Sequence, residues 1–212
     1  LASVVAALAT WSLSDTRRAR CWTSGALAKE FDTMADHPGR LDGAPGDARL
    51  EEFRQQLRHL LRRGPADLAT ASQLPTGVAH LDAYSRNLIF PAVGGNIGVV
   101  EWANVGTAPI PTDAATVFTL SLDYLDVNAG DVDALESAVL DALQRASAHS
   151  AGDDDHADGF RAISRLRHLA MMMNALPMVE RRDPAVSNIV GRPIDVIVAQ
   201  WLAVGEHLLS TR

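Results

Sequence analysis

Cysteine is almost absent from the chain. Cys21 is the sole cysteine among 212 residues, so no disulfide bond can form within the chain. A zinc centre built on several thiolates is excluded for the same reason. A lone thiol is usually inert and partly buried, and it favours a reducing compartment. The sequence therefore points away from disulfide-rich secreted domains.

Positive charge is scarce as well. The formal net charge at pH 7 is −7, and Lys29 is the only lysine beside a larger set of arginines. Proteins that grip nucleic-acid phosphates as their main work are usually basic overall. We therefore expect contact with nucleic acid only by loose enclosure or through local arginine contacts.

Long apolar runs are missing too. The apolar opening segment, 1–13, ends before Asp15 and is shorter than the about 20 residues that a membrane-spanning helix needs. It also lacks the basic region and the cleavage site of a signal peptide. The sequence thus predicts no membrane partner, no signal peptide or transmembrane segment, and a location in the cytoplasm or within a virion.

The glycine-rich stretch at 94–98 departs from the known phosphate-binding loops. Gly94, Gly95 and Gly98 do not have the G-x-G-x-x-G spacing, and a strand-like segment follows them where a dinucleotide loop needs a helix. The lysine of a P-loop is also missing. We predict a turn or bulge between antiparallel strands at 94–96, without a bound nucleotide.

Other catalytic and metal-binding motifs are incomplete. The seven histidines fall in no metal-ligand spacing, and no serine lies in a G-x-S-x-G elbow. The acidic segment 153–158 resembles the first half of an EF-hand loop, but Arg165 stands where that loop needs a glutamate. We predict a solvated loop in which Asp158 caps the next helix, and leave cation binding there as an alternative. No catalytic, cofactor-binding or metal-binding residue is predicted.

Hydrophobic periodicity divides the chain into three parts. The first, 1–70, is predicted to be helical, with helices at 1–13, about 15–35 and 48–63. Asp47 is available to cap the third helix, and Gly64 with Pro65 should end it. The last part, 131–212, also has helical spacing. Its helices are expected to begin at an Asp133–Glu136 capping box, near residue 160 and near Pro193.

The middle part, 74–127, is rich in β-branched and aromatic residues. Three segments are predicted to be strands: 86–93, 96–105 and 115–127. Strands bracketed by helices favour an α+β fold that is predominantly helical with a small central antiparallel sheet. We expect 1–212 to be a single α+β domain or a segment of a larger chain, because both ends have the character of core helices.

Apolar residues cover more of the last helix than packing on one neighbour requires. Such surplus surface favours association with a partner. Arg161 and Arg165 lie four residues apart, on one helix face, and could meet a phosphate or an acidic neighbour. The interface candidates are therefore Trp201, Ile197, Leu208, Arg161 and Arg165.

Three classes of function remain after these exclusions. The favoured hypothesis is a structural protein that acts by association with copies of itself or of a larger assembly, most concretely a segment of a viral capsid protein. The first alternative is an enzyme or small-molecule binder whose site is assembled by the tertiary fold. The second is a helical regulatory or adaptor domain that binds a partner through 161–182. The balance of motifs leans against an enzyme.

Overall fold

The fold is α+β and predominantly helical, as the sequence predicted. The computed structural model describes residues 20–21, 29, 31–33, 35–36, 41, 47–83, 87–89, 98–102, 105–124, 129–147 and 153–211. The longer elements in this part of the chain are, in order, β1 (Arg20–Cys21), α3 (Ala48–Gln73), β2 (Thr76–Ala79), β3 (Leu88–Ile89), β4 (Gly98–Val99), β5 (Gly106–Pro109), α4 (Thr112–Tyr124), α5 (Ala129–Ser147), α6 (Asp153–Glu180), α7 (Pro184–Val190) and α8 (Ile194–Ser210).

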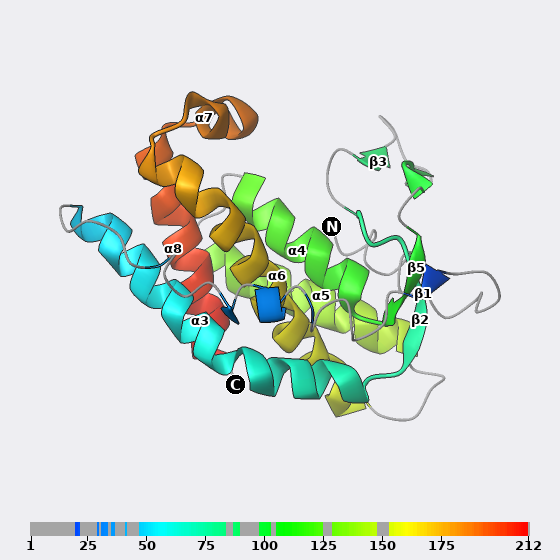
Figure 1. Cartoon of the computed structure of the whole chain (residues 1–212). Helices are drawn as coiled ribbons and strands as arrows, with labels where there is room; N and C mark the ends of the chain where they lie inside the picture. Colours follow the sequence, from blue (N-terminus) through cyan, green and yellow to red (C-terminus); the bar gives the residue numbers. More distant parts are fainter. Residues whose placement is uncertain are drawn as a thin grey trace.

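The short strands lie at one end of a helical body (Figure 1). One sheet has the order β1-β5-β2, in which β5 pairs parallel with β1 and antiparallel with β2. The other is an antiparallel pair, with Leu88 opposite Val99 and Ile89 opposite Gly98. This pairing confirms the predicted antiparallel strands on either side of the glycine-rich stretch, whereas residues 94–96 lie outside the described part of the chain.

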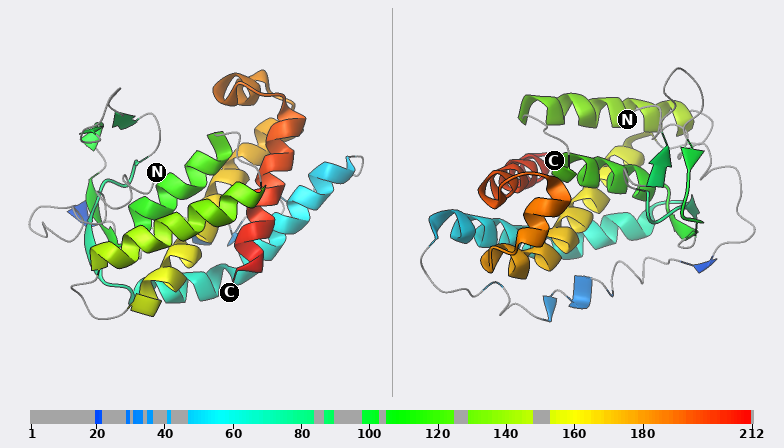
Figure 2. Two further views of the ribbon diagram at one scale, coloured as in Figure 1. Left: turned by 180° about the vertical axis from the view of Figure 1, so that it is seen from behind. Right: turned by 90° about the horizontal axis from the view of Figure 1, so that it is seen from above.

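Two apolar clusters form the core of the helical body, and α6 contributes to both. The first joins α3, α6 and α8, where the rings of Phe53 and Trp201 stack with centroids 6.0 Å apart. The second joins α6 to α4 and α5, where Phe118 meets Phe160 edge-on at 5.2 Å. The views in Figure 2 show α6 between these neighbours. The aromatic contacts add directional packing to the burial of apolar surface.

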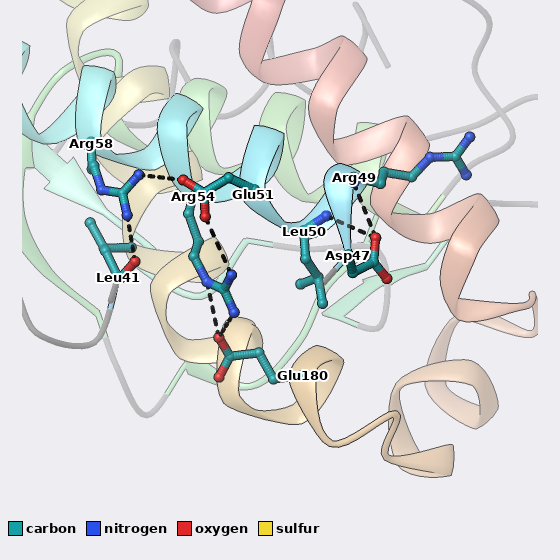
Figure 3. Close-up of polar contacts among 8 residues, drawn as sticks. All are labelled: Leu41, Asp47, Arg49, Leu50, Glu51, Arg54, Arg58 and Glu180. Atoms are coloured by element: carbon teal, nitrogen blue, oxygen red, sulfur yellow. Dashed lines mark hydrogen bonds and ion pairs between the residues drawn. The ribbon is translucent and has the colours of Figure 1, made fainter. Parts of the chain in front are cut away.

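Arginine–carboxylate contacts connect α3 to the rest of the helical body. Arg54 donates from Nη2 to Glu180 Oε1 of α6 at 2.6 Å and also contacts Glu51, as Figure 3 shows. Deeper in the core, the Arg165 guanidinium of α6 binds both oxygens of the Asp67 carboxylate, with Nη2 to Oδ1 at 2.7 Å. Because both Arg165 and Asp67 are buried, their charges depend on each other for solvation.

Segment 115–127 was predicted to be a strand, and that prediction is wrong, because Thr112–Tyr124 form α4. The described side chains from Thr112 to Phe118 are all buried, so this helix shows no amphipathic stripe that would reveal it in the sequence. The hydroxyls of Thr116 and Thr119 donate to the carbonyl oxygens of Thr112 and Ala115, at 2.8 Å each. These bonds satisfy the polar groups of β-branched residues inside a helix, against their usual strand preference.

The predicted end of the third helix at Gly64 and Pro65 is also wrong. Asp47 caps α3 as predicted, accepting bonds from the amides of Arg49 and Leu50 (Figure 3), but the helix continues to Gln73. Pro65 is exposed, and Gly64 is covered by the Phe31 ring, which occupies the space that a Cβ atom would need. Beyond Pro65 the helix buries Asp67, which binds Arg165, and Ala71, and these contacts are kept despite the hydrogen bond that proline loses.

Three further boundaries differ from prediction. Arg20 and Cys21 form β1 inside the predicted helix 15–35, whereas the predicted helix 1–13 lies outside the described residues. The predicted acidic loop is the beginning of α6, so Asp158 lies within that helix and does not cap it. Asp133 and Glu136 lie inside α5 rather than at its start, and Glu136 binds Arg161 and His207 instead of closing a capping box.

Removing one partner of the buried Arg165–Asp67 pair should be strongly destabilising. Asp67→Ala leaves the Arg165 charge without its carboxylate, and we expect a loss of about 3–5 kcal/mol in the free energy of unfolding, measured with urea. Replacing both residues together, as Asp67→Leu with Arg165→Met, should cost much less than the sum of the single changes. Equal losses for Asp67→Ala and for the exposed control Asp141→Ala would contradict this account.

A second charged cluster predicts how stability depends on pH. His207 of α8 contacts Glu136 through Nε2 and Asp133 through Nδ1, the latter at 3.0 Å, while Arg161 donates to Glu136 at 2.7 Å. The hydrogen bond to Glu136 raises the pKa of His207 above its ordinary 6.5 despite partial burial. Burial raises the pKa of Glu136, but the bonds from His207 and Arg161 bring it below its ordinary 4.5.

Because of these shifts, the cluster contributes most to the free energy of unfolding between about pH 4.5 and 6.5. The contribution of Glu136 is lost as pH falls through its lowered pKa, and that of His207 is lost as pH rises through its raised pKa. We expect His207→Gln to flatten the decline in melting temperature between mildly acidic and alkaline buffers. The exposed Asp141 of α5, changed to Asn, is the control and should leave the profile as in the wild type.

Candidate functional site

A loop with a His-Leu-Asp sequence follows β2 at the strand end of the molecule. Asp82 is half-buried, and the buried Asn87 donates from Nδ2 to the Asp82 carbonyl at 2.8 Å and to its carboxylate Oδ2 at 3.1 Å. The side-chain amide of Asn87, the residue before the next strand, β3, therefore orients the Asp82 carboxylate. Two polar side chains, five residues apart in sequence, are thus held together at the beginning of β3.

Asp113, in the first turn of α4, holds this loop in place through hydrogen bonds to its backbone. Its carboxylate accepts the backbone amides of His80 at 2.6 Å and of Leu81 at 2.9 Å. Burial raises the pKa of Asp113, and these two hydrogen bonds oppose that rise. Leu81 has a positive φ of 64°, a conformation that is uncommon for a residue with a Cβ atom. Asp113 therefore supports a strained backbone immediately before Asp82.

The antiparallel pairing of β3 and β4 brings a second carboxylate, that of Glu101, into the neighbourhood of Asn87. Because the end of β4 lies beside the beginning of β3, Glu101 follows β4 close to Asn87. The amide of Val100 donates to the Asn87 carbonyl at 2.9 Å, which fixes the residue before Glu101. Glu101 is exposed and also has a positive φ of 64°. Asp82, Asn87 and Glu101 thus converge from the ends of β2, β3 and β4.

His80 connects the two sides of the site. Its Nε2 lies 2.8 Å from the Val100 carbonyl, so the ring carries a proton on Nε2 and donates it there. The edge of Trp102 meets the His80 ring at a centroid separation of 4.8 Å, and the indole N–H donates to the Val99 carbonyl at 2.8 Å. The backbone on both sides of Glu101 is therefore held, while the Glu101 side chain remains accessible.

The donor set of the site suits a hard divalent cation that arrives with phosphate groups. Asp82 and Glu101 offer carboxylates, and Asn87 offers its amide oxygen because its nitrogen is committed to Asp82. Within the described residues, no group of three or more His, Cys, Asp or Glu side chains is placed to hold a metal alone. Mg²⁺ commonly binds one or two carboxylates and completes its shell with water and substrate phosphates, so the oxygen donors present fit it.

The five interface candidates lie elsewhere, in the helical body. Trp201, Ile197 and Leu208 are buried within the chain's own core, and Arg165 binds Asp67 there. Arg161 pairs with Glu136. Their packing accounts for most of the wide apolar face of α8, because this helix contacts α3, α4, α5 and α6. The role of these residues at an intermolecular interface stays a prediction. Within the described chain, no helix combines the length and apolar character needed to cross a membrane.

The sequence contains a signal for this site that the predictions above did not use. His80, Asp82 and Asn87 have the spacing of the H-R-D-L-x-x-x-N catalytic loop of protein kinases, with Leu81 in place of the arginine. The spacing matches no metal-binding or hydrolase pattern, the two kinds against which the histidines were interpreted above. Glu101 then occupies the place, after the next strand, at which kinases have an aspartate that binds Mg²⁺.

Comparison with solved structures gives a related fold. An aminoglycoside phosphotransferase from Alicyclobacillus acidocaldarius is 16% identical, with a TM-score of 0.61, over 97% of this chain and 66% of that one. An ethanolamine kinase from Plasmodium vivax is 12% identical, with a TM-score of 0.49, over 96% of this chain and 58% of that one. The chain thus spans slightly less than two thirds of the first structure. No curated protein gives a significant match to the sequence.

The family model that matches the chain decides between the functional hypotheses. The model of the phosphotransferase enzyme family (APH) covers residues 1–154, which is most of the chain and includes the whole site. The favoured hypothesis, a structural assembly protein and segment of a viral capsid, is therefore wrong. The alternative of an enzyme with a site assembled by the tertiary fold is the better supported one. The chain belongs to the phosphotransferase enzyme family.

Proposed function

We propose that this protein transfers the terminal phosphoryl group of a nucleoside triphosphate to a hydroxyl group of a small molecule. The observation that carries the proposal is the convergence of Asp82, Asn87 and Glu101 at the ends of β2, β3 and β4. Phosphoryl transfer needs positioning and charge stabilisation more than covalent chemistry, and such a set of oxygen donors supplies both.

Asp82 is the residue that handles the proton of the acceptor. Its carboxylate accepts the hydroxyl proton as the new oxygen–phosphorus bond forms, while the bond from phosphorus to the bridging oxygen breaks and the nucleoside diphosphate leaves. Asn87 holds Asp82 in orientation through the bonds to its carbonyl and carboxylate. Asn87 and Glu101 are the residues that would hold Mg²⁺, which neutralises charge on the transferred phosphate when it is bound.

Apolar side chains beside the site can receive the base of the nucleotide. Ile89, Val100 and Trp102 are 56%, 36% and 43% exposed, which is unusual for large apolar residues. All three belong to β3 or to the segment that begins after β4, next to Asn87 and Glu101. Exposed apolar groups near convergent polar groups are typical of a ligand site.

The acceptor and the extent of the enzyme are also proposals. One solved structure with this fold is named as an aminoglycoside phosphotransferase, so aminoglycosides are the first acceptors to test. We propose that the protein acts in the cytoplasm, where nucleoside triphosphates are supplied and a lone cysteine stays reduced. We keep the prediction that 1–212 is a single α+β domain or a segment of a larger chain.

The transfer can be measured with γ-labelled ATP, Mg²⁺ and a panel of aminoglycosides. We expect Asp82→Asn to lower kcat by about 10²–10⁴-fold, because the acceptor proton loses its base, with little change in ATP affinity. Glu101→Gln should raise the Mg²⁺ concentration needed for half-maximal rate. The exposed Asp141→Asn of α5 is the matched control. Turnover by Asp82→Asn equal to that of the control, or no transfer by the wild type to any acceptor or to water, would refute the proposal.

Asp113 provides a separate test of how the loop is positioned. Asp113→Asn keeps the shape of the side chain but turns an N–H donor toward one of the two amides of His80 and Leu81. Leaving a buried amide without its acceptor costs about 1–3 kcal/mol, so exchange of these amides with solvent should accelerate by roughly 10–100-fold. We expect kcat to fall with it, while ATP affinity is largely kept. Unchanged exchange at both amides would show that Asp113 does not hold the loop.

A further inference from the structure

A groove runs between α3 and α8, on a part of the helical body that the proposed site does not use. Its volume is about 510 Å³. It is lined by Glu52, Gln55, Gln56, His59, Arg62, Leu202, Glu206 and Leu209. The two helices lie side by side in Figures 1 and 2.

The two helices run in the same direction with a fixed register. Arg49 donates to the Asp195 carbonyl at 3.3 Å, and Gln56 donates to the Leu202 carbonyl at 2.7 Å. Both pairs are 146 residues apart, so the same offset holds over two turns of each helix. Each residue of α3 in the groove can therefore be placed level with a residue of α8.

The charges along the α3 side of the groove are segregated and lack partners. Glu52 lies at one end and Arg62 at the other, ten residues or about 15 Å further along the helix. Both are exposed, and neither has a hydrogen bond or ion pair among the described residues. Gln55 and His59, also exposed, lie between them. When a second α3 lies antiparallel to the first, Glu52 of each helix comes opposite Arg62 of the other. The order of charges along α3 is therefore self-complementary.

The α8 side of the groove carries an apolar row that is left partly uncovered. Leu202 and Leu209 line the groove and are half-buried. They are seven residues apart, which is the heptad spacing of helices that pack against a partner. The apolar row and the segregated charges thus lie beside each other on one face.

We propose that this face is an isologous interface with a second copy of the chain. A two-fold axis across the helices, level with the middle of the groove, sets α3 antiparallel to the partner subunit's α3, and α8 antiparallel to its counterpart. Glu52 of each copy then faces Arg62 of the other, and Gln55 faces His59. The four helices form a bundle across the axis.

This interface goes beyond the proposed activity and does not depend on it. It also differs from the predicted association through Trp201, Ile197 and Leu208, since those side chains are buried inside each copy. Charge complementarity is the argument for a second copy over another partner, because the same patch supplies both members of each ion pair.

Charge reversal tests the interface with sedimentation velocity and light scattering over a concentration series. We expect a dimer for the wild type, and at least a roughly tenfold weaker dimer for Glu52→Arg and for Arg62→Glu, because each places two like-charged pairs across the axis. An equimolar mixture of the two variants should recover dimers, since every pair in the mixed dimer is again of opposite sign. The double variant Glu52→Arg with Arg62→Glu should also dimerise.

The matched control is Arg181→Glu, an exposed arginine beyond the end of α6, which should keep the wild-type size. Circular dichroism and melting temperature check that each variant is folded, which is expected because the reversed side chains are exposed. A monomeric wild type, a series of ever larger assemblies, or single variants that dimerise like the wild type would each overturn the proposal. Failure of the equimolar mixture to recover dimers would overturn it as well.

Discussion

The buried carboxylate of Asp113 is the constraint on which the candidate site depends. A carboxyl group in the core needs hydrogen-bond partners, and the first turn of a helix is a favourable place for it because the N-terminal end of the helix is electropositive. Asp113 meets this need with the amides of His80 and Leu81. The same two bonds set the left-handed backbone of Leu81, and with it the position of Asp82. The hydrogen bonds that satisfy the buried carboxyl group therefore also set the geometry of the site.

The helical body supplies the rigidity behind that arrangement. α4 can present Asp113 at a fixed place because α4 packs on α6, and α6 is held to α3 by Arg165–Asp67 and Arg54–Glu180. Buried ion pairs contribute little net stability compared with apolar residues of equal volume, but an unpaired member would be costly. We interpret them as contacts that fix the register of α3 against α6, with the apolar clusters supplying most of the free energy.

The proposed phosphotransferase site is divided between a rigid part and an accessible part. Asn87 and His80 are buried and have fixed partners, whereas Glu101 is exposed on a strained backbone. Strain at a residue with an accessible carboxylate is typical of functional sites, where the surrounding contacts stabilise the strained backbone. Here the contacts of Val100 and Trp102 on either side of Glu101 carry that role. A ligand that binds Glu101 therefore meets a carboxylate whose backbone is already positioned.

The sequence by itself determined the helical majority, the capping of α3 by Asp47 and the antiparallel strands around the glycines, because these follow from local periodicity and capping chemistry. It also contained the spacing of His80, Asp82 and Asn87, a local pattern that is readable without the fold. Tertiary structure alone decided that Thr112–Tyr124 is a helix, since burial on all sides erases the periodic signal. It alone brought Asp113 and Glu101 to the loop, because strand pairing and helix packing join residues that no local pattern connects. The wide apolar face of α8 misled the functional hypothesis for the same reason: whether such a face meets its own chain or a partner is decided by how many helices of that chain surround it.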